Sequence, residues 1–100
     1  MTELDPAVVL HALARHPSLR GFVRHGRVDT MPARLSRRRL LLNEVAQAFE
    51  PGIRYPEREV NGVLAAIHPD WAALRRYLVD EGFLDRAAGM YWRVGGTVPA

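Results

Sequence analysis

The stretch HPDWAALRRYLVDEGFLDRAAGMYWR, residues 68–93, decides the fold that we predict for this chain. Its first half has the features of an amphipathic helix. Asp70 is a residue type preferred at a helix N-cap, and Trp71, Leu74 and Leu78 recur at the spacing of one buried face. The sequence therefore predicts a helix over residues 70–81.

The second half of this stretch predicts a helix end followed by a β-hairpin. Gly82 stands where a helix C-terminus favours a left-handed residue, and Phe83 is placed to pack back on Leu78. Two strand-like runs, LDR and MYWRV, follow, and residues 87–89 form a short turn between them.

Two further helices and a short strand are expected before this stretch. SRRRLLLNEVAQAFEPG (36–52) places Ser36 at a cap and Pro51-Gly52 at the end. Residues 53–55 are long enough only to pair with the hairpin, and PEREVNGVLAAIHP (56–69) reads as an amphipathic helix. The order helix, strand, helix, helix, hairpin is that of the winged helix-turn-helix.

The N-terminal region adds one more helix. Asp5 is a suitable N-cap and Pro6 suits the first helical position, while Val8, Val9 and Leu13 lie near one face. This face either covers the core or makes a subunit contact. Residues 21–32 are expected to form a loop or a weak strand pair.

We therefore predict an α+β, mostly helical protein, a winged helix-turn-helix with an additional N-terminal helix. Residues 1–20 are expected to be an extension or dimer contact, and residues 21–100 the winged-helix domain. At 100 residues the chain is expected to form one core. The absence of Cys excludes disulfide scaffolds, thiolate zinc sites and Cys nucleophiles.

The charge of this sequence is unevenly distributed. The net charge is +3, and all 14 basic residues are Arg. Residues 15–39 hold eight Arg and one acid, whereas residues 70–81 hold two Arg and three acids. With no run of roughly 20 apolar residues and no signal-peptide pattern, we expect a cytoplasmic protein outside the membrane.

Four local patterns resemble one bacterial family, domain of unknown function number 2087. They are MPARLSRRR (31–39), FEPGIRYPEREVN (49–61), HPDWAALRRYLVDEGFLDR (68–86) and GMYWR (89–93). The matching positions are Tyr55, Glu57, Glu59, Val60, Asn61, Asp70, Leu74, Arg75, Arg76, Gly82, Arg86, Gly89 and Tyr91. The resemblance covers roughly residues 22–93 and implies a winged-helix protein associated with transcription, of unassigned biochemical activity.

Our leading hypothesis is a transcriptional regulator that binds double-stranded DNA. The helix over 70–81 would face the major groove, and the Arg run 34–39 would contact the phosphate backbone. The candidate contacts are Arg34, Arg37, Arg38, Arg39, Ala73, Arg75, Arg76, Arg86 and Arg93. A homodimer or a regulator protein as partner is expected, because one such unit reads few bases.

Several of these residues have plainer alternatives. If Leu74 and Leu78 face the core, Arg75 points away from it and reaches a base or a phosphate, whereas an ion pair with Glu57 or Glu59 would hold it inside the fold. The net negative charge of residues 70–81 favours a competing hypothesis. In that case the same fold is a protein-interaction or ligand-sensing module that does not bind DNA.

No catalytic residue, metal site or cofactor is predicted. Glu57 and Glu59 lie two residues apart at a helix start and diverge, and Asn61 is expected to hydrogen-bond with Glu57 or the backbone. The four His lack metal-ligand spacing, and His68 is expected near a helix end. Aromatic residues, Trp71, Tyr91 and Trp92 among them, are expected to serve the core rather than stack on bases.

Overall fold

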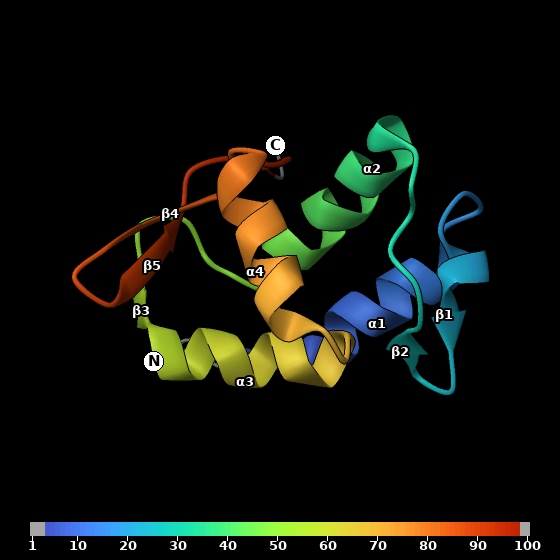
Figure 1. Cartoon of the computed structure of the whole chain (residues 1–100), viewed down its shortest axis with the longest axis horizontal. Coiled ribbons are helices and arrows are strands. Elements are labelled where there is room, and N and C mark those ends of the chain that lie inside the picture. Colours follow the sequence, from blue (N-terminus) through green and yellow to red (C-terminus); the bar gives the residue numbers. More distant parts are fainter. Residues whose placement is uncertain (1–3, 99–100) are drawn as a thin grey trace.

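The computed structural model describes residues 4–98. Within this range the chain forms ten short helices and strands, four of them α-helices, joined by loops (Figure 1). The helical elements are α1 (Pro6–Arg15), η1 (Arg20–Phe22), α2 (Leu35–Ala46), α3 (Glu57–Ile67) and α4 (Trp71–Asp80). The strands are β1 (Val23–Arg24), β2 (Arg27–Val28), β3 (Arg54–Pro56), β4 (Leu84–Ala87) and β5 (Met90–Arg93). The expected order after residue 34 is confirmed.

Local capping sets three helix ends as predicted: the starts of α1 and α4 and the end of α4. Asp5 accepts a hydrogen bond from the backbone N–H of Ala7 at 2.9 Å, and Asp70 accepts one from Ala73 at 3.1 Å. These bonds satisfy backbone donors that have no partner within the helix. At the end of α4, Gly82 has a φ of +80° and the N–H of Phe83 donates to the carbonyl of Leu78 at 2.9 Å.

The start of α2 differs from the prediction. The helix begins at Leu35, so Ser36 lies in its first turn rather than at the N-cap. Arg34 occupies the N-cap position, and no side chain caps this end of the helix. An N-cap residue has an extended backbone, which directs its side-chain oxygen toward the following N–H groups. Ser36 is helical, so its hydroxyl does not cap the helix.

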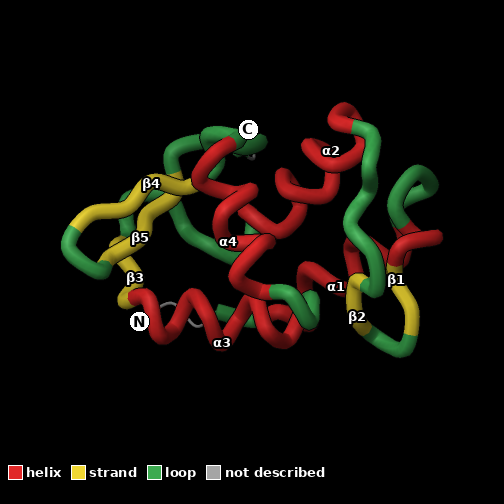
Figure 2. The backbone as a smooth tube through the Cα atoms, viewed as in Figure 1, coloured by secondary structure: helices red, strands yellow, loops and turns green. Residues whose placement is uncertain are grey.

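The strands form two small antiparallel sheets (Figure 2). One has the order β3-β5-β4, with Tyr55 opposite Tyr91 and Tyr91 opposite Arg86. Its hairpin turn consists of Ala88 and Gly89, both at positive φ, because Ala87, which was expected in the turn, pairs with Met90. The second sheet pairs β1 with β2, so residues 21–32 contain the strand pair that was one of the two expectations.

One core joins the helices and the larger sheet. Its fully buried side chains include Leu13 of α1, Leu42 of α2, Leu64 of α3 and Leu74 of α4, and Tyr91 of β5 is 1% exposed. The larger sheet lies at one end of the long axis and the β1–β2 hairpin at the other (Figure 1). The core therefore lies between the larger sheet at one end of the molecule and the β1–β2 hairpin at the other.

Helix α1 covers this core. Val9 and Leu13 are buried in it, and α1 packs against both α2 and α3. Val8, the third residue of the predicted apolar face, is 66% exposed. Of the two roles expected for this helix, the structure shows core coverage for Val9 and Leu13.

Candidate functional site

Arg75 does not point away from the core, as its place in the sequence had suggested. Its Nη1 donates to Oδ1 of Asn61 at 2.6 Å and lies 3.1 Å from Oε1 of Glu57. The guanidinium carbon is 5.6 Å from the ring centroids of both Trp71 and Tyr91, and only 20% of the side chain is exposed. Arg75 therefore ties α4 to α3 and β5, the plainer alternative considered above.

Tyr91 extends this contact into a polar network. Its hydroxyl donates to Oε1 of Glu57 at 3.2 Å and accepts from Nη1 of Arg86 at 3.5 Å. The hydrogen bond with Tyr91 raises the pKa of the Arg86 guanidinium. The network joins α3, α4 and the β4–β5 hairpin. Its carboxylate, guanidinium and hydroxyl groups are paired with one another, so none of them is left as a reactive group.

Of the polar residues in the sequence YPEREVN (55–61), Asn61 joins the Arg75 contact, whereas Glu59 and Tyr55 lie outside the network. Asn61 bonds with Arg75, not with Glu57 or the backbone as expected. Glu59 is exposed and has no hydrogen-bond or ion-pair partner within residues 4–98. Tyr55 is buried on the sheet, where its hydroxyl accepts from the backbone N–H of Glu50 at 3.0 Å. Glu57 and Glu59 thus do not converge on a shared substrate position.

Arg76 lies on the accessible side of α4, and Ala73 does not. Arg76 is exposed and pairs with no residue of the described range, whereas Ala73 is half-buried. Asp70 and Asp80, at either end of the helix, are exposed acids. The outer surface of α4 therefore carries one available cation beside two carboxylates.

Two Arg of the α2 start are engaged with α4 and the segment after it. Nη1 of Arg39 lies 2.8 Å from Oε1 of Glu81 and 3.2 Å from the Glu81 carbonyl, and its guanidinium lies over the ring of Phe83 at 5.2 Å. The guanidinium of Arg38 lies 4.9 Å from the ring centroid of Tyr77. These contacts reduce the charge that the two residues offer to a ligand.

Arg93 cannot act as the wing contact that the sequence suggested. It is 8% exposed, and its guanidinium donates to the carbonyls of Phe49 at 3.3 Å, Gly95 at 2.9 Å and Thr97. Because the strand alternates sides, Arg93 shares the inner face of the sheet with Tyr91. Arg86, the other candidate on the hairpin, is exposed.

Four further available cations lie near the β1–β2 hairpin. Four residues are exposed, and their guanidinium groups have no partner among the described residues: Arg20, Arg24, Arg34 and Arg37. We call these four residues the basic end, because η1, β1 and the start of α2 lie on the same side of the molecule (Figure 1). Arg20 and Arg24 were not candidates individually, although the charge tally over residues 15–39 contained the signal.

The chemistry of these groups is electrostatic. Within residues 4–98 no cluster of three or more His, Cys, Asp or Glu is arranged to hold a metal ion. His68 is buried, and its Nδ1 lies 2.7 Å from the Val28 carbonyl, which ties the end of α3 to β2. Guanidinium groups without intramolecular partners are suited to binding phosphate or carboxylate.

None of the described helices has the length and apolar character to span a membrane.

Comparison with known proteins gives one relationship. No curated protein and no solved structure matches the chain. The sequence profile of a family described as "Uncharacterized protein conserved in bacteria" matches residues 27–93, a segment that holds β2 to β5. This confirms the resemblance seen in the sequence, and the chain belongs to that bacterial family, DUF2087.

Proposed function

We propose that this protein is a winged-helix protein that binds double-stranded DNA mainly through the phosphate backbone. The observation that carries the proposal is the basic end, four exposed guanidinium groups that nothing else in the described chain neutralises. Phosphate neutralisation by Arg releases counterions from DNA and supplies most of its non-specific affinity.

The fold supports this proposal. The succession α2, β3, α3, α4 and the β4–β5 hairpin, with sheet order β3-β5-β4, agrees with a winged helix in which α4 is the third helix and the hairpin is the wing. Arg76 on α4 and Arg86 on the hairpin are the cations that these two elements would present.

The contribution of α2 comes from its first turn. Arg34 and Arg37 flank a helix N-terminus that no side chain caps, so backbone N–H groups and the helix dipole favour an anion at the same place. A phosphate there would offset the unfavourable placement of three Arg at the positive end of a helix. Arg75 and Arg93 are not part of the proposed interface, because both guanidinium groups are held inside the fold.

A second candidate function has its own supporting observation. Arg39 and Arg75 are bound to Glu81 and Glu57, so the surface around α4 is nearly neutral. Such a surface suits a protein partner that packs on α4, which makes the chain a protein-interaction module. This candidate requires no DNA binding.

Fluorescence anisotropy with a labelled mixed-sequence duplex separates the two. If the four cations of the basic end contact phosphates, raising salt about fourfold weakens binding by roughly 100-fold. The variant Arg34→Ala/Arg37→Ala should reduce the slope of log affinity against log salt by about 2.

The matched control is Arg54→Ala/Arg58→Ala, which removes the same charge from β3 and the first turn of α3, at the far end of the molecule (Figure 1). Its salt slope should equal that of the unaltered protein. Equal losses in the two double variants would show that only net charge matters. Absence of binding at low salt would refute DNA binding and favour the protein-interaction candidate.

A further inference from the structure

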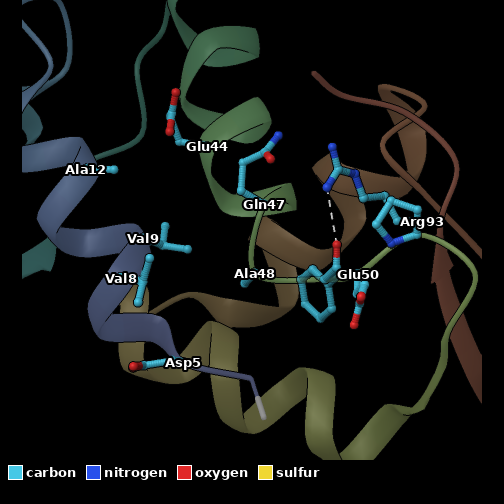
Figure 3. A pocket seen from close by; sticks show the side chains of 11 residues that line it. Asp5, Val8, Val9, Ala12, Glu44, Gln47, Ala48, Glu50 and Arg93 are labelled. Carbon is cyan, nitrogen blue, oxygen red and sulfur yellow. Dashed lines mark hydrogen bonds between the residues drawn. The ribbon is translucent and has the colours of Figure 1, made fainter. Parts of the chain in front are cut away.

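An open groove lies between α1 and the C-terminal end of α2 with the segment 47–51 that follows it, and its volume is about 550 Å³ (Figure 3). Its apolar lining comes from Val8, Val9, Ala12, Ala48 and Phe49. Val8 and Val9 project from α1 toward α2, and the small side chains of Ala12 and Ala48 leave the gap between the helices unfilled (Figure 3). The 66% exposed Val8 is the most exposed of the large apolar residues described.

Carboxylates surround this apolar lining. Asp5, Glu44 and Glu50 line the groove, and the one cationic side chain in it is Arg93. Arg93 is buried and its donors are directed at the carbonyls of the chain, so its charge is already solvated by the protein. The groove is therefore acidic in a chain whose net charge is +3.

Glu44 is the residue on which the identity of a ligand depends. It is half-buried, and its carboxylate makes no hydrogen bond or ion pair with any residue in the range 4–98. It lies in the last turns of α2, where the helix dipole adds negative potential. A partly desolvated carboxylate at this end of a helix is stabilised by a cation.

We propose that the groove binds a small organic cation with an apolar body. The volume lies within the roughly 300–1,000 Å³ typical of small-molecule sites. The apolar body would cover Val8, Val9 and Ala48, and the cationic group would face Glu44. A neutral ligand would leave this carboxylate without a partner, and an anion would be repelled by it.

A second copy of the chain is not the occupant that this chemistry favours. Two-fold pairing of the groove with itself would bring Asp5 and Glu44 of both copies together, and like charges in a shared interface are unfavourable. The proposed site is independent of DNA binding, since it shares no residue with the basic end.

Titration with tetraphenylphosphonium and tetraphenylborate tests the proposal, because the two ions share size and shape and differ in charge. Binding is followed by backbone amide chemical shifts in the full chain. Tetraphenylphosphonium should shift the amides of Val9, Ala12 and Ala48, with an affinity at least tenfold above that of tetraphenylborate at the same amides. Shifts spread over the surface, or none at millimolar ligand, would overturn the proposal.

Variants locate the charge and the cavity separately. Glu44→Gln should weaken tetraphenylphosphonium binding about fivefold, the size of one partly screened charge pair. Glu59→Gln, at an exposed acid of α3 without a partner in the described range, should leave it unchanged. Equal weakening by the two variants would contradict the site.

Ala12→Leu and Ala48→Leu each place a larger side chain in the groove, and either should weaken binding at least tenfold. Two filling variants keep the test valid if one of them fails to fold. Retained affinity in a folded filling variant would show that the cation binds elsewhere.

Discussion

At the scale of single residues, Arg75 and Arg76 are consecutive on α4, yet one contacts the fold and the other is exposed to solvent. Adjacent helical residues point about 100° apart. Measured from the mean direction of the buried Leu74 and Leu78, Arg75 is rotated by about 80° and Arg76 by about 180°, so the prediction that Arg75 points away from the core was wrong. Arg75 lies at the flank of the buried face, against α3, where an acid, an amide and two aromatic rings contact it. Arg76 has no such neighbours and stays exposed.

Replacing Arg75 tests this difference. Arg75→Ala should lower the free energy of unfolding by about 2 kcal/mol, because it removes a charged hydrogen bond to Asn61 together with packing on Trp71 and Tyr91. The partly exposed ion pair with Glu57 adds at most about 1 kcal/mol. Urea denaturation measures the change, with Arg76→Ala as the control, expected within about 0.5 kcal/mol of the unaltered protein.

The same pair also bears on DNA binding. At a temperature where both variants are folded, Arg76→Ala should weaken duplex binding and Arg75→Ala should not. A loss of affinity in Arg75→Ala alone would show that this guanidinium leaves Glu57 and Asn61 to reach DNA.

At the scale of elements, two glycines have opposite relations to their surroundings. Gly62 lies inside α3 with nothing near the position that a Cβ would occupy. Gly95 follows β5 and lies against the backbone at the end of α4, where a Cβ would be 2.3 Å from the Gly82 carbonyl oxygen. The first is a conformational weakness in a helix, and the second permits the C-terminal segment to pack on the α4 turn.

Alanine at these positions should therefore have opposite effects. Gly62→Ala should raise the free energy of unfolding by about 0.5–1 kcal/mol, because Ala loses less backbone entropy in a helix. Gly95→Ala should lower it by about 1–3 kcal/mol, since the backbone at Gly82 cannot move aside without cost. Thermal unfolding followed by circular dichroism measures both, and the same sign in the two variants would contradict these packing assignments.

At the scale of the whole molecule, the core extends beyond the part that the family profile matches. The profile covers residues 27–93, yet Val9, Leu13 and Leu19 belong to the same buried cluster as α2, α3 and α4. Positive and negative charge occupy different parts of the molecule. The basic end lies near β1 and the start of α2, and the acidic groove lies between α1 and the end of α2.

Helix α1 is therefore expected to be part of the folding unit. Leu13→Ala should lower the free energy of unfolding by about 2–5 kcal/mol, as for a leucine of a central core. Val8→Ala, one turn earlier on the exposed side, should change it by less than about 0.5 kcal/mol. Chemical denaturation in a single transition would support this, whereas a Leu13→Ala variant of unchanged stability would make α1 a detachable extension.

The sequence by itself determined the features that depend on neighbours a few residues apart. Caps at Asp5 and Asp70, the apolar stripes and the Gly82 ending predicted the helices and hairpin, because backbone geometry and helix periodicity act over one or two turns. The family resemblance could likewise be found from local patterns, and it is confirmed for residues 27–93.

Only the tertiary structure decided which cations are available to a ligand. Arg39 meets Glu81, Arg75 meets Glu57, and Arg93 meets the Phe49 carbonyl, all across long separations in the sequence. Periodicity predicts the side of a helix on which a guanidinium lies, but not the acid or carbonyl that another element brings there. That is why Arg75 and Arg93 leave the set of candidate DNA contacts, whereas Arg34 and Arg37 stay in it and Arg20 and Arg24 join it.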